Sequence, residues 1–289
     1  MYCLEIKNVF IVSSGQTIDV ACAIAQTLAD SNVGVSLKCA DDSGCREAIE
    51  KIKRALDTRV TGEELKAEQA EAALGRIQTT TDLADAGNAD VVIESVFEDK
   101  ELKQETLKKL DGICPAETIF ATNTSTITVT NLASVTSRPE KVIGMHFIYF
   151  SPVMKVVEIV RGLKTSEATF AAVNDFTQAV EMESVVAEDA PGLLSTRIWM
   201  VHLNEAANNV FNKLVEPEAL VKLNRTISPN AFSILESADF IGLDNCVALL
   251  QNLYYAYGDP KYLPSALLTL MVDAGQLGMK SGKGFFNYS

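Results

Sequence analysis

NTSTITVTNLASVTSRPEKVIGMHFIYFSPVMKVVE, residues 123–158, is the stretch that decides the fold of this chain. It contains one of the two histidines in 289 residues, His146, and a glutamate twelve positions later, Glu158. Both stand at the ends of short apolar runs, VIGMHF and VVEIV, that are typical of buried strands. Strand ends are where an α/β sheet presents its chemistry, so we expect the two side chains to meet at one sheet edge.

The pairing of His146 with Glu158 predicts a general base. Histidine is the side chain whose unperturbed pKa lies in the working range of a cell, and a carboxylate orients its ring and supports its charged form. A histidine beside an apolar run is also common as a hydrogen-bonded structural residue, and a glutamate within a strand can be a buried polar residue. The two residues alone leave both interpretations open.

The surrounding pattern predicts an α/β domain followed by a helical one. Short apolar runs alternate with amphipathic stretches, which is typical of a parallel sheet with right-handed crossovers. After the Asp189–Gly192 stretch, DAPG, the pattern is helical as far as about residue 276. We therefore expect an α/β domain over 1–188 and an all-α domain over 189–289. The expected strands cover 9–12, 33–37, 89–96, 118–123, 141–147 and 156–160, and the expected helices cover 21–29, 100–110 and a hairpin over 44–74 broken near 61–62.

Composition excludes several classes of function. The formal net charge is −13, and nucleic acids or anionic membranes need basic surfaces. The six cysteines are scattered without metal-binding spacing, which predicts no metal site and a reducing compartment, the cytoplasm. The start of the chain does not resemble a signal peptide, and no apolar run is long enough for a membrane span.

The first strand is followed by a turn, SSGQTI, that invites comparison with the dinucleotide fingerprint G-x-G-x-x-G. Gly15 keeps the middle glycine, so Gly15 and Gln16 are candidates for contact with a pyrophosphate. Ser13 replaces the glycine of the tight turn and has to accept any strained φ there, and Ile18 replaces the glycine that allows close helix packing.

Two further positions bear on the same site. Asp19 falls in the first helical turn, where its charge is expected to oppose an anionic ligand. The acidic residue expected after the second strand is Cys39 by position, preceded by Lys38, and Asp41 is the candidate to replace it. A working dinucleotide site and a domain that has lost or weakened such binding both remain open.

Seven segments form a specific pattern: ADVVIESVFEDKELK, IFATNTSTI, RPEKVIGMHF, PVMKVVEIVRG, ADFIGLD, YGDPKY and GQLGMKSGKGFFNYS. With them the chain resembles the short-chain L-3-hydroxyacyl-CoA dehydrogenases, including the bacterial 3-hydroxybutyryl-CoA dehydrogenases, over essentially its whole length. The resemblance implies a Rossmann-type N-terminal domain, a helical hairpin near the CoA, an all-α C-terminal dimerisation domain and a homodimer. It also implies NAD-dependent oxidation of a 3-hydroxyacyl-CoA to a 3-ketoacyl-CoA.

Roles carry over where residues match the family. The resemblance implies that His146 is the catalytic base, Glu158 its partner and Ser125 a hydroxyl that contacts substrate. It places Asn123 beside the nicotinamide, and Glu98 and Lys103 along the cofactor site. On the hairpin, Lys53 and Arg54 belong to a basic cluster that is either a CoA phosphate patch or a solvated helix face.

Some family positions differ here. Tyr149-Phe150 replaces an Asn-Pro pair, Thr196 replaces a substrate-contacting asparagine, and residues 230–234 depart from the family turn that shapes the acyl end of the cleft. These changes leave acyl length open, and Lys38 together with the altered turn after the first strand leaves open NAD, NADP or no cofactor. The alternative to an enzyme is a non-catalytic CoA-ester-binding subunit, acting alone or with a different partner chain.

Overall fold

The computed structural model describes residues 6–148, 156–227 and 233–288, and it divides the chain into two compact units. The first unit is Met1–Asp189 and the second is Ala190–Ser289. Within the described residues, no helix has the length and apolar character needed to cross a membrane.

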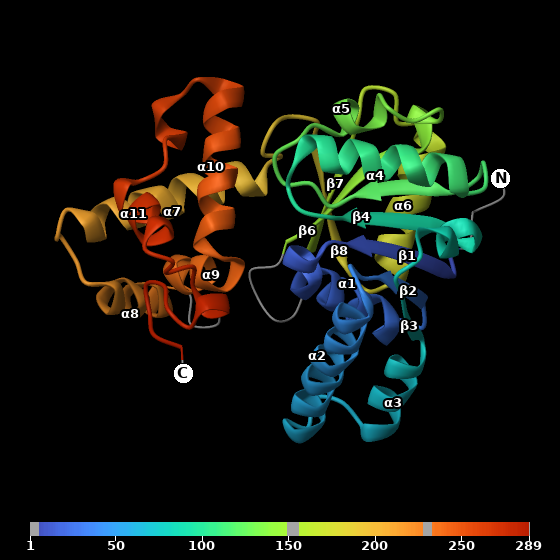
Figure 1. Cartoon of the computed structure of the whole chain (residues 1–289), viewed down its shortest axis with the longest axis horizontal. Coiled ribbons are helices and arrows are strands. Elements are labelled where there is room, and N and C mark those ends of the chain that lie inside the picture. The colour runs from blue at the N-terminus through green and yellow to red at the C-terminus, as the bar shows by residue number, and fades with distance from the viewer. Residues whose placement is uncertain (1–5, 149–155, 228–232, 289) are drawn as a thin grey trace. The chain divides into compact units, whose positions relative to one another are not determined.

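The first unit is built on one eight-stranded sheet in the order β3-β2-β1-β4-β5-β6-β7-β8 (Figure 1). Its first six strands are parallel and follow the 3-2-1-4-5-6 order of dinucleotide-binding sheets. The strands are β1 (Asn8–Ser13), β2 (Gly34–Lys38), β3 (Ile77–Thr80), β4 (Val91–Ser95), β5 (Ile119–Thr122), β6 (Val142–Phe147), β7 (Val156–Arg161) and β8 (Glu183–Glu188).

The last two strands correct the expectation of a wholly parallel sheet. β7 runs antiparallel to β6, and β8 runs parallel to β7. Only residues 148–155 separate β6 from β7. A parallel crossover needs a dozen or more residues, so this connection can only return the chain antiparallel.

Helices cover both faces of the sheet. Figure 1 shows α4 and α5 on one side and α1 on the other, and α6 joins α1 in packing against the sheet's main apolar core. Val9, Ile11 and Ile93 alternate in sequence with residues of the opposite face, so each strand contributes to both layers. The helices of this unit are α1 (Ile18–Asp30), α2 (Asp42–Thr61), α3 (Ala67–Gly75), α4 (Lys100–Ile113), α5 (Val129–Ala133) and α6 (Glu167–Ala179).

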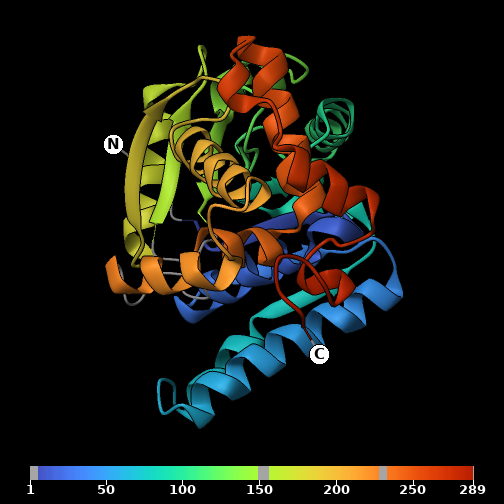
Figure 2. The same ribbon diagram turned by 90° about the vertical axis from the view of Figure 1, so that its left-hand side faces the viewer.

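The predicted helical hairpin is confirmed. α2 begins after Asp41, whose side chain accepts a hydrogen bond from the Gly44 amide at 2.8 Å, and it ends at Gly62. α3 follows after a short turn, and Figure 2 shows the pair extending beyond the sheet of their own unit. The buried residues of α2, which include Ile52 and Leu56, hold the hairpin against the sheet's core.

The second unit is helical in its described residues, as predicted. Gly258 ends α10 as its C-cap, in the left-handed conformation with φ 63°. Buried Asp239 anchors the C-terminal tail by accepting the Phe285 and Phe286 amides at 2.9 and 3.0 Å. The helices are α7 (Ser195–Phe211), α8 (Pro217–Ile227), α9 (Ile234–Ile241), α10 (Leu243–Tyr257) and α11 (Ala266–Asp273).

Candidate active site

His146 and Glu158 face each other across two antiparallel strands. They are direct register partners, and His146 Nδ1 lies 3.2 Å from Glu158 Oε2. His146 is 7% exposed and Glu158 is 1% exposed. Glu158 is the third residue of β7, so it stands within the strand and not at its end. The antiparallel pairing places this part of β7 beside the carboxyl end of β6, which explains why the two side chains still meet.

Ser125 completes a line of three polar side chains. Its Oγ lies 3.1 Å from His146 Nε2, on the opposite side of the ring from Glu158. The carboxylate beside Nδ1 favours the tautomer with a proton on that nitrogen, which leaves Nε2 as the acceptor. The arrangement can accept a proton at Nε2 and stabilise the imidazolium that results.

Gly144 explains how the loop bearing Ser125 comes so close to β6. A Cβ at Gly144 would lie 2.9 Å from a Val129 methyl and 3.0 Å from Val160 Cβ. Glycine therefore allows α5, which begins at Val129, to pack closely on the sheet. This packing sets the loop over the end of β6, where His146 stands.

Asn123 joins three neighbouring strand ends. Its Nδ2 donates to Ser95 Oγ at 3.3 Å, and its Oδ1 accepts the Phe147 amide at 2.9 Å. The residue lies at the carboxyl end of β5, between the ends of β4 and β6. Its side chain thereby holds this part of the sheet edge in a fixed arrangement.

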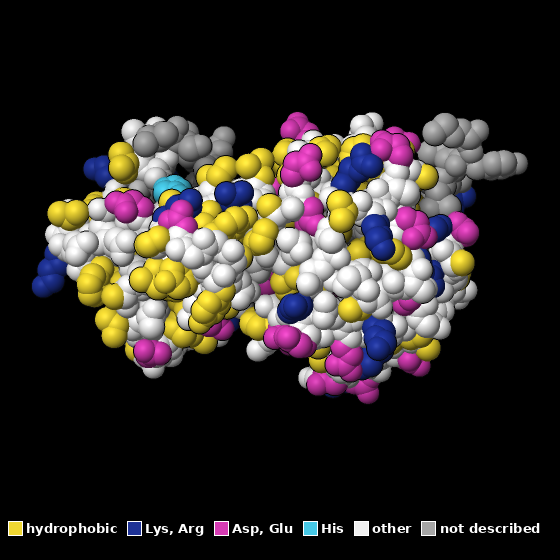
Figure 3. Space-filling view, turned by 90° about the horizontal axis from the view of Figure 1, so that it is seen from above, with side chains coloured by type: hydrophobic (Ala, Val, Ile, Leu, Met, Phe, Trp, Pro, Cys, Tyr) yellow, Lys and Arg dark blue, Asp and Glu magenta, His cyan; other side chains and the backbone are white. Residues whose placement is uncertain are grey.

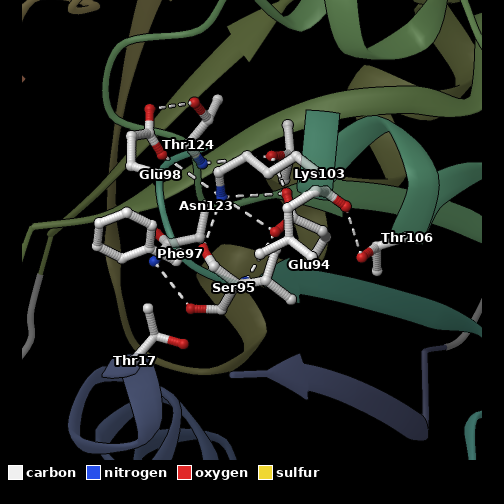
Figure 4. Close-up of polar contacts among 12 residues, drawn as sticks. Thr17, Glu94, Ser95, Phe97, Glu98, Lys103, Thr106, Asn123 and Thr124 are labelled. Carbon is white, nitrogen blue, oxygen red and sulfur yellow. Dashed lines mark hydrogen bonds and ion pairs between the residues drawn. The ribbon is translucent and has the colours of Figure 1, made fainter. Parts of the chain in front are cut away.

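Glu98 and Lys103 belong to a buried network (Figure 4). Lys103 is 1% exposed, and its Nζ lies 3.0 Å from Glu94 Oε1 and 3.4 Å from Glu98 Oε2. Burial acts to lower the pKa of Lys103, but these two carboxylates outweigh it and raise the pKa above its ordinary value. The ammonium is thus enclosed among protein groups, and the place of Lys103 along a cofactor site stays a prediction.

Sequence reasoning missed Glu94. It is fully buried in β4, accepts the Val96 amide at 2.8 Å and accepts Thr122 Oγ1 at 2.7 Å. The signal that could have found it is the one used for Glu158, a glutamate within an otherwise apolar strand.

The turn after β1 is regular despite its missing glycines. Ser13 is an ordinary last residue of β1, and its hydroxyl donates to the Lys38 carbonyl at 3.0 Å. A 3-10 turn over Gly15–Thr17 precedes α1, and Ile18 packs into the apolar core at 7% exposure. The strain expected at Ser13 is therefore absent, and the chain accommodates Ile18 by starting the helix with a tighter turn.

Asp19 is paired, which alters its expected effect on an anion. The Nζ of Lys51, in α2, lies 2.6 Å from Asp19 Oδ1 and 2.9 Å from Glu47 Oε1. The ammonium offsets part of the negative charge at the start of α1. The hairpin thus supplies a cation beside Asp19 that sequence spacing did not reveal, and the opposition of Asp19 to an anionic ligand stays a prediction.

The turn fits a bound dinucleotide. Nothing lies within 4 Å of the position that a Cβ would take at Gly15, so an approaching phosphate finds open backbone there. Gln16 is exposed beside it. Asp41 is exposed near the end of β2, although one of its oxygens already caps α2. This turn and the end of β4 lie at the point where strand order reverses, which is where such sheets bind nucleotides.

The other predicted substrate residues are dispersed. Lys53 and Arg54 are exposed on α2 and have no ion-pair partner among the described residues, whereas Lys51 and Arg59 pair with α1. Thr196 is 4% exposed near the start of α7, in the second unit. Tyr149 lies outside the described residues, as do Phe150 and residues 230–232 of the divergent turn. The described residues contain no cluster of three or more potential metal ligands.

The strand order and the open turn define a dinucleotide-binding α/β protein. Residues 11–190 match the family model described as 3-hydroxyacyl-CoA dehydrogenase, NAD binding domain. Residues 192–288 match the model described as 3-hydroxyacyl-CoA dehydrogenase, C-terminal domain. The chain belongs to the 3-hydroxyacyl-CoA dehydrogenase family.

Individual relatives resemble the whole chain. A probable 3-hydroxybutyryl-CoA dehydrogenase of Bacillus subtilis (strain 168) is 37% identical over 285 residues, covering 99% of this chain and 98% of that protein. A 3-hydroxybutyryl-CoA dehydrogenase of Clostridioides difficile is 36% identical over 271 residues, covering 92% and 95%. The crystal structure of (S)-3-hydroxybutyryl-CoA dehydrogenase from Ralstonia eutropha has a TM-score of 0.84 at 36% identity, covering 99% and 100%.

Proposed function

We propose that this chain is an enzyme that oxidises a 3-hydroxyacyl-CoA to the 3-ketoacyl-CoA with NAD, reversibly, and that a short acyl chain such as 3-hydroxybutyryl is its substrate. The observation that carries the proposal is the line formed by Ser125 Oγ, the His146 ring and Glu158, with contacts of 3.1 and 3.2 Å. The names of the relatives support the substrate class. An intact proton-transfer line favours an enzyme over a non-catalytic CoA-ester-binding subunit.

The residues divide the work of the reaction as follows. His146 Nε2 accepts the proton of the substrate hydroxyl, from the direction that the Ser125 hydroxyl now occupies. Glu158 stabilises the resulting imidazolium through Nδ1, and Ser125 orients the substrate oxygen. When bound, NAD supplies the acceptor for the hydride that leaves the same carbon. Gly15, Gln16 and Asn123 are the residues that would hold it, and Lys53 and Arg54 offer charge for CoA phosphates.

We infer NAD in preference to NADP. Asp41 is exposed near the end of β2, where a carboxylate can bind ribose hydroxyls and would repel a 2′-phosphate. Lys38 is the feature that would favour NADP. Initial rates with 3-hydroxybutyryl-CoA and each dinucleotide test the proposal: a higher kcat/KM with NAD supports it. Oxidation with neither dinucleotide, together with calorimetric binding of the CoA ester, would instead identify a non-catalytic binding protein.

We also infer a homodimer formed through the second unit, in a reducing, cytoplasmic setting. Of the sixteen large hydrophobic side chains that are exposed in the described residues, eleven belong to Ala190–Ser289. Figure 3 shows hydrophobic side chains gathered over this unit. The exposed ones include Ile198 at 64% and Leu270 at 56% exposure. The five described cysteines are free thiols, which fits a reducing compartment.

A further inference from the structure

The segment between β4 and α4 contacts two other segments (Figure 4). One is the turn after β1, residues 14–17, and the other is the loop over residues 124–127 that carries Ser125, called the serine loop below. On one side, the Phe97 amide donates to Ser14 Oγ at 3.1 Å, in the turn after β1. On the other side, the neighbouring Glu98 carboxylate reaches the loop that carries Ser125. The segment is therefore fixed at a place where it can set the position of that loop.

One carboxylate oxygen of Glu98 accepts hydrogen bonds from several groups of the serine loop. Glu98 Oε1 accepts hydrogen bonds from the backbone amides of Ser125 at 3.0 Å, Thr126 at 2.6 Å and Ile127 at 3.3 Å. It also accepts the hydroxyls of Thr124 at 2.7 Å and Thr126 at 2.8 Å. Because charged acceptors make the stronger hydrogen bonds, this oxygen fixes the backbone on which the Ser125 hydroxyl depends.

The other oxygen of Glu98 faces the buried ammonium. Lys103 Nζ lies 3.4 Å from Glu98 Oε2 and also donates to Glu94 and to the Val96 carbonyl, both at 3.0 Å. The Glu98 side chain is only 13% exposed, so little water reaches it to take the place of these hydrogen bonds. The ammonium thus keeps the carboxylate charged and oriented toward the serine loop.

We propose that Glu98 is a positioning residue for the reaction, whose carboxylate, held by Lys103 and Glu94, keeps the Ser125 hydroxyl against His146 Nε2. The role assigned to Glu98 differs from direct contact with the dinucleotide, and it rests on the proposed function only in naming the reaction. In the proposed reaction Ser125 and His146 contact the substrate oxygen, whereas Glu98 acts on them through the loop backbone.

Steady-state kinetics separate the two roles. Glu98→Gln keeps an oxygen for the loop but loses the charge toward Lys103, and Glu98→Ala loses both. We expect kcat to fall on the order of tenfold in the first variant and a hundredfold in the second, with KM for NAD changed by less than about twofold. Glu105→Gln, on the exposed face of α4 where Glu105 pairs with Lys109, is the control and retains wild-type kinetics. A raised KM for NAD with unchanged kcat would overturn the proposal.

Nuclear magnetic resonance gives a readout without cofactor or turnover. The chain has only two histidines, and His202 is exposed on α7, so His202→Gln assigns both ring signals. We expect Ser125→Ala and Glu98→Ala to displace the titration curve of His146 in the same direction, while that of His202 stays in place. The proposal is contradicted if the His146 curve of Glu98→Ala coincides with that of wild type while the curve of Ser125→Ala is displaced.

The outcomes of the two experiments remain distinguishable. A wild-type protein that fails to oxidise CoA esters would remove the proposed function, and the His146 titration would still test the positioning by Glu98. If Glu98→Ala does not fold by circular dichroism, Glu98→Gln carries both measurements. An undisplaced His146 curve in Ser125→Ala would also count against the proposal, because it would remove the contact through which Glu98 acts.

Discussion

Two glutamates interrupt apolar strands of this sheet, Glu94 in β4 and Glu158 in β7, and each faces a nitrogen that can carry positive charge. Glu94 contacts Lys103 at 3.0 Å and Glu158 contacts His146 at 3.2 Å. A buried carboxylate without such a partner would cost several kcal/mol. At the residue scale, each of these two buried carboxylates therefore has a nitrogen partner. The pair at Lys103 is enclosed, and the pair at His146 stands beside the half-buried hydroxyl of Ser125.

Ionised Glu98 is expected to stabilise the fold, and the effect should depend on pH. Burial acts to raise the pKa of Glu98, but Lys103 and the Thr124 and Thr126 hydrogen bonds hold it below the ordinary value. The stabilisation is therefore complete above the ordinary carboxyl pKa and is lost as pH falls through the lower pKa of the folded state. Urea unfolding should show Glu98→Gln least stable relative to wild type near pH 7, with the difference shrinking below about pH 4. A difference that grows in acid would contradict this sign.

At the element scale, the close packing of α5 on β6 holds the serine loop in place. A substitution at Gly144, where the two elements meet, tests this packing. Gly144→Ala would place a Cβ 2.9 Å from Val129, so we expect a loss of about 1–3 kcal/mol in the free energy of unfolding. Gly112→Ala in α4 is the matched control, since nothing lies within 4 Å of its added Cβ and alanine favours a helix. Equal stability of the two variants in urea unfolding would show that the contact is not tight.

The turn before α1 offers a second test at this scale. Restoring the fingerprint glycine at Ile18 would destabilise the domain, because Ile18 is buried in the core. Asp19→Ser alone therefore tests the turn without that loss of packing. Removing Asp19 takes a negative charge from the start of α1 and leaves Lys51 paired with Glu47 alone, so we expect the Kd for NAD to fall about two- to fivefold. Asp57→Ser, on an exposed part of α2, changes net charge equally and should leave Kd unchanged in calorimetry. A weaker affinity in Asp19→Ser would show that this carboxylate helps to bind.

Much of the fold could be predicted because its strands are apolar and its helices amphipathic. The strands that escaped prediction are β3, IQTT, and β8, ESVVAE, whose polar residues hide the pattern of a sheet edge. His146 and Glu158 were found because their residue types are rare in such strands. The Asp19–Lys51 pair, the Glu94–Lys103 pair and the closeness of Ser125 to the ring arise from tertiary packing, which sequence spacing does not reveal.

At the scale of the whole molecule, each unit matches one of the two domains of the family. All of the residues assigned to proton transfer and cofactor binding belong to the first unit. Thr196, where the family has a substrate-contacting asparagine, belongs to the second. The second unit also carries most of the exposed large hydrophobic side chains, which indicates an interface.

The proposed homodimer predicts the mass of the protein in solution. We expect sedimentation equilibrium at micromolar concentration to give about twice the mass of one chain, which is 31.3 kDa. Raising the ionic strength should not dissociate the assembly, because the proposed contact is apolar and not electrostatic. A mass of one chain under both conditions would contradict a dimer built on the second unit.

The rate of 3-hydroxybutyryl-CoA oxidation in a His146→Gln variant, followed by NADH absorbance, tests the central claim most directly. His202→Gln is the matched control, since it changes the other histidine of the chain. We predict that kcat falls roughly 10²–10⁴-fold in His146→Gln, the range contributed by a general base, while His202→Gln keeps wild-type turnover. Near-normal kcat in a folded His146→Gln protein would show that the proton leaves the substrate by another route.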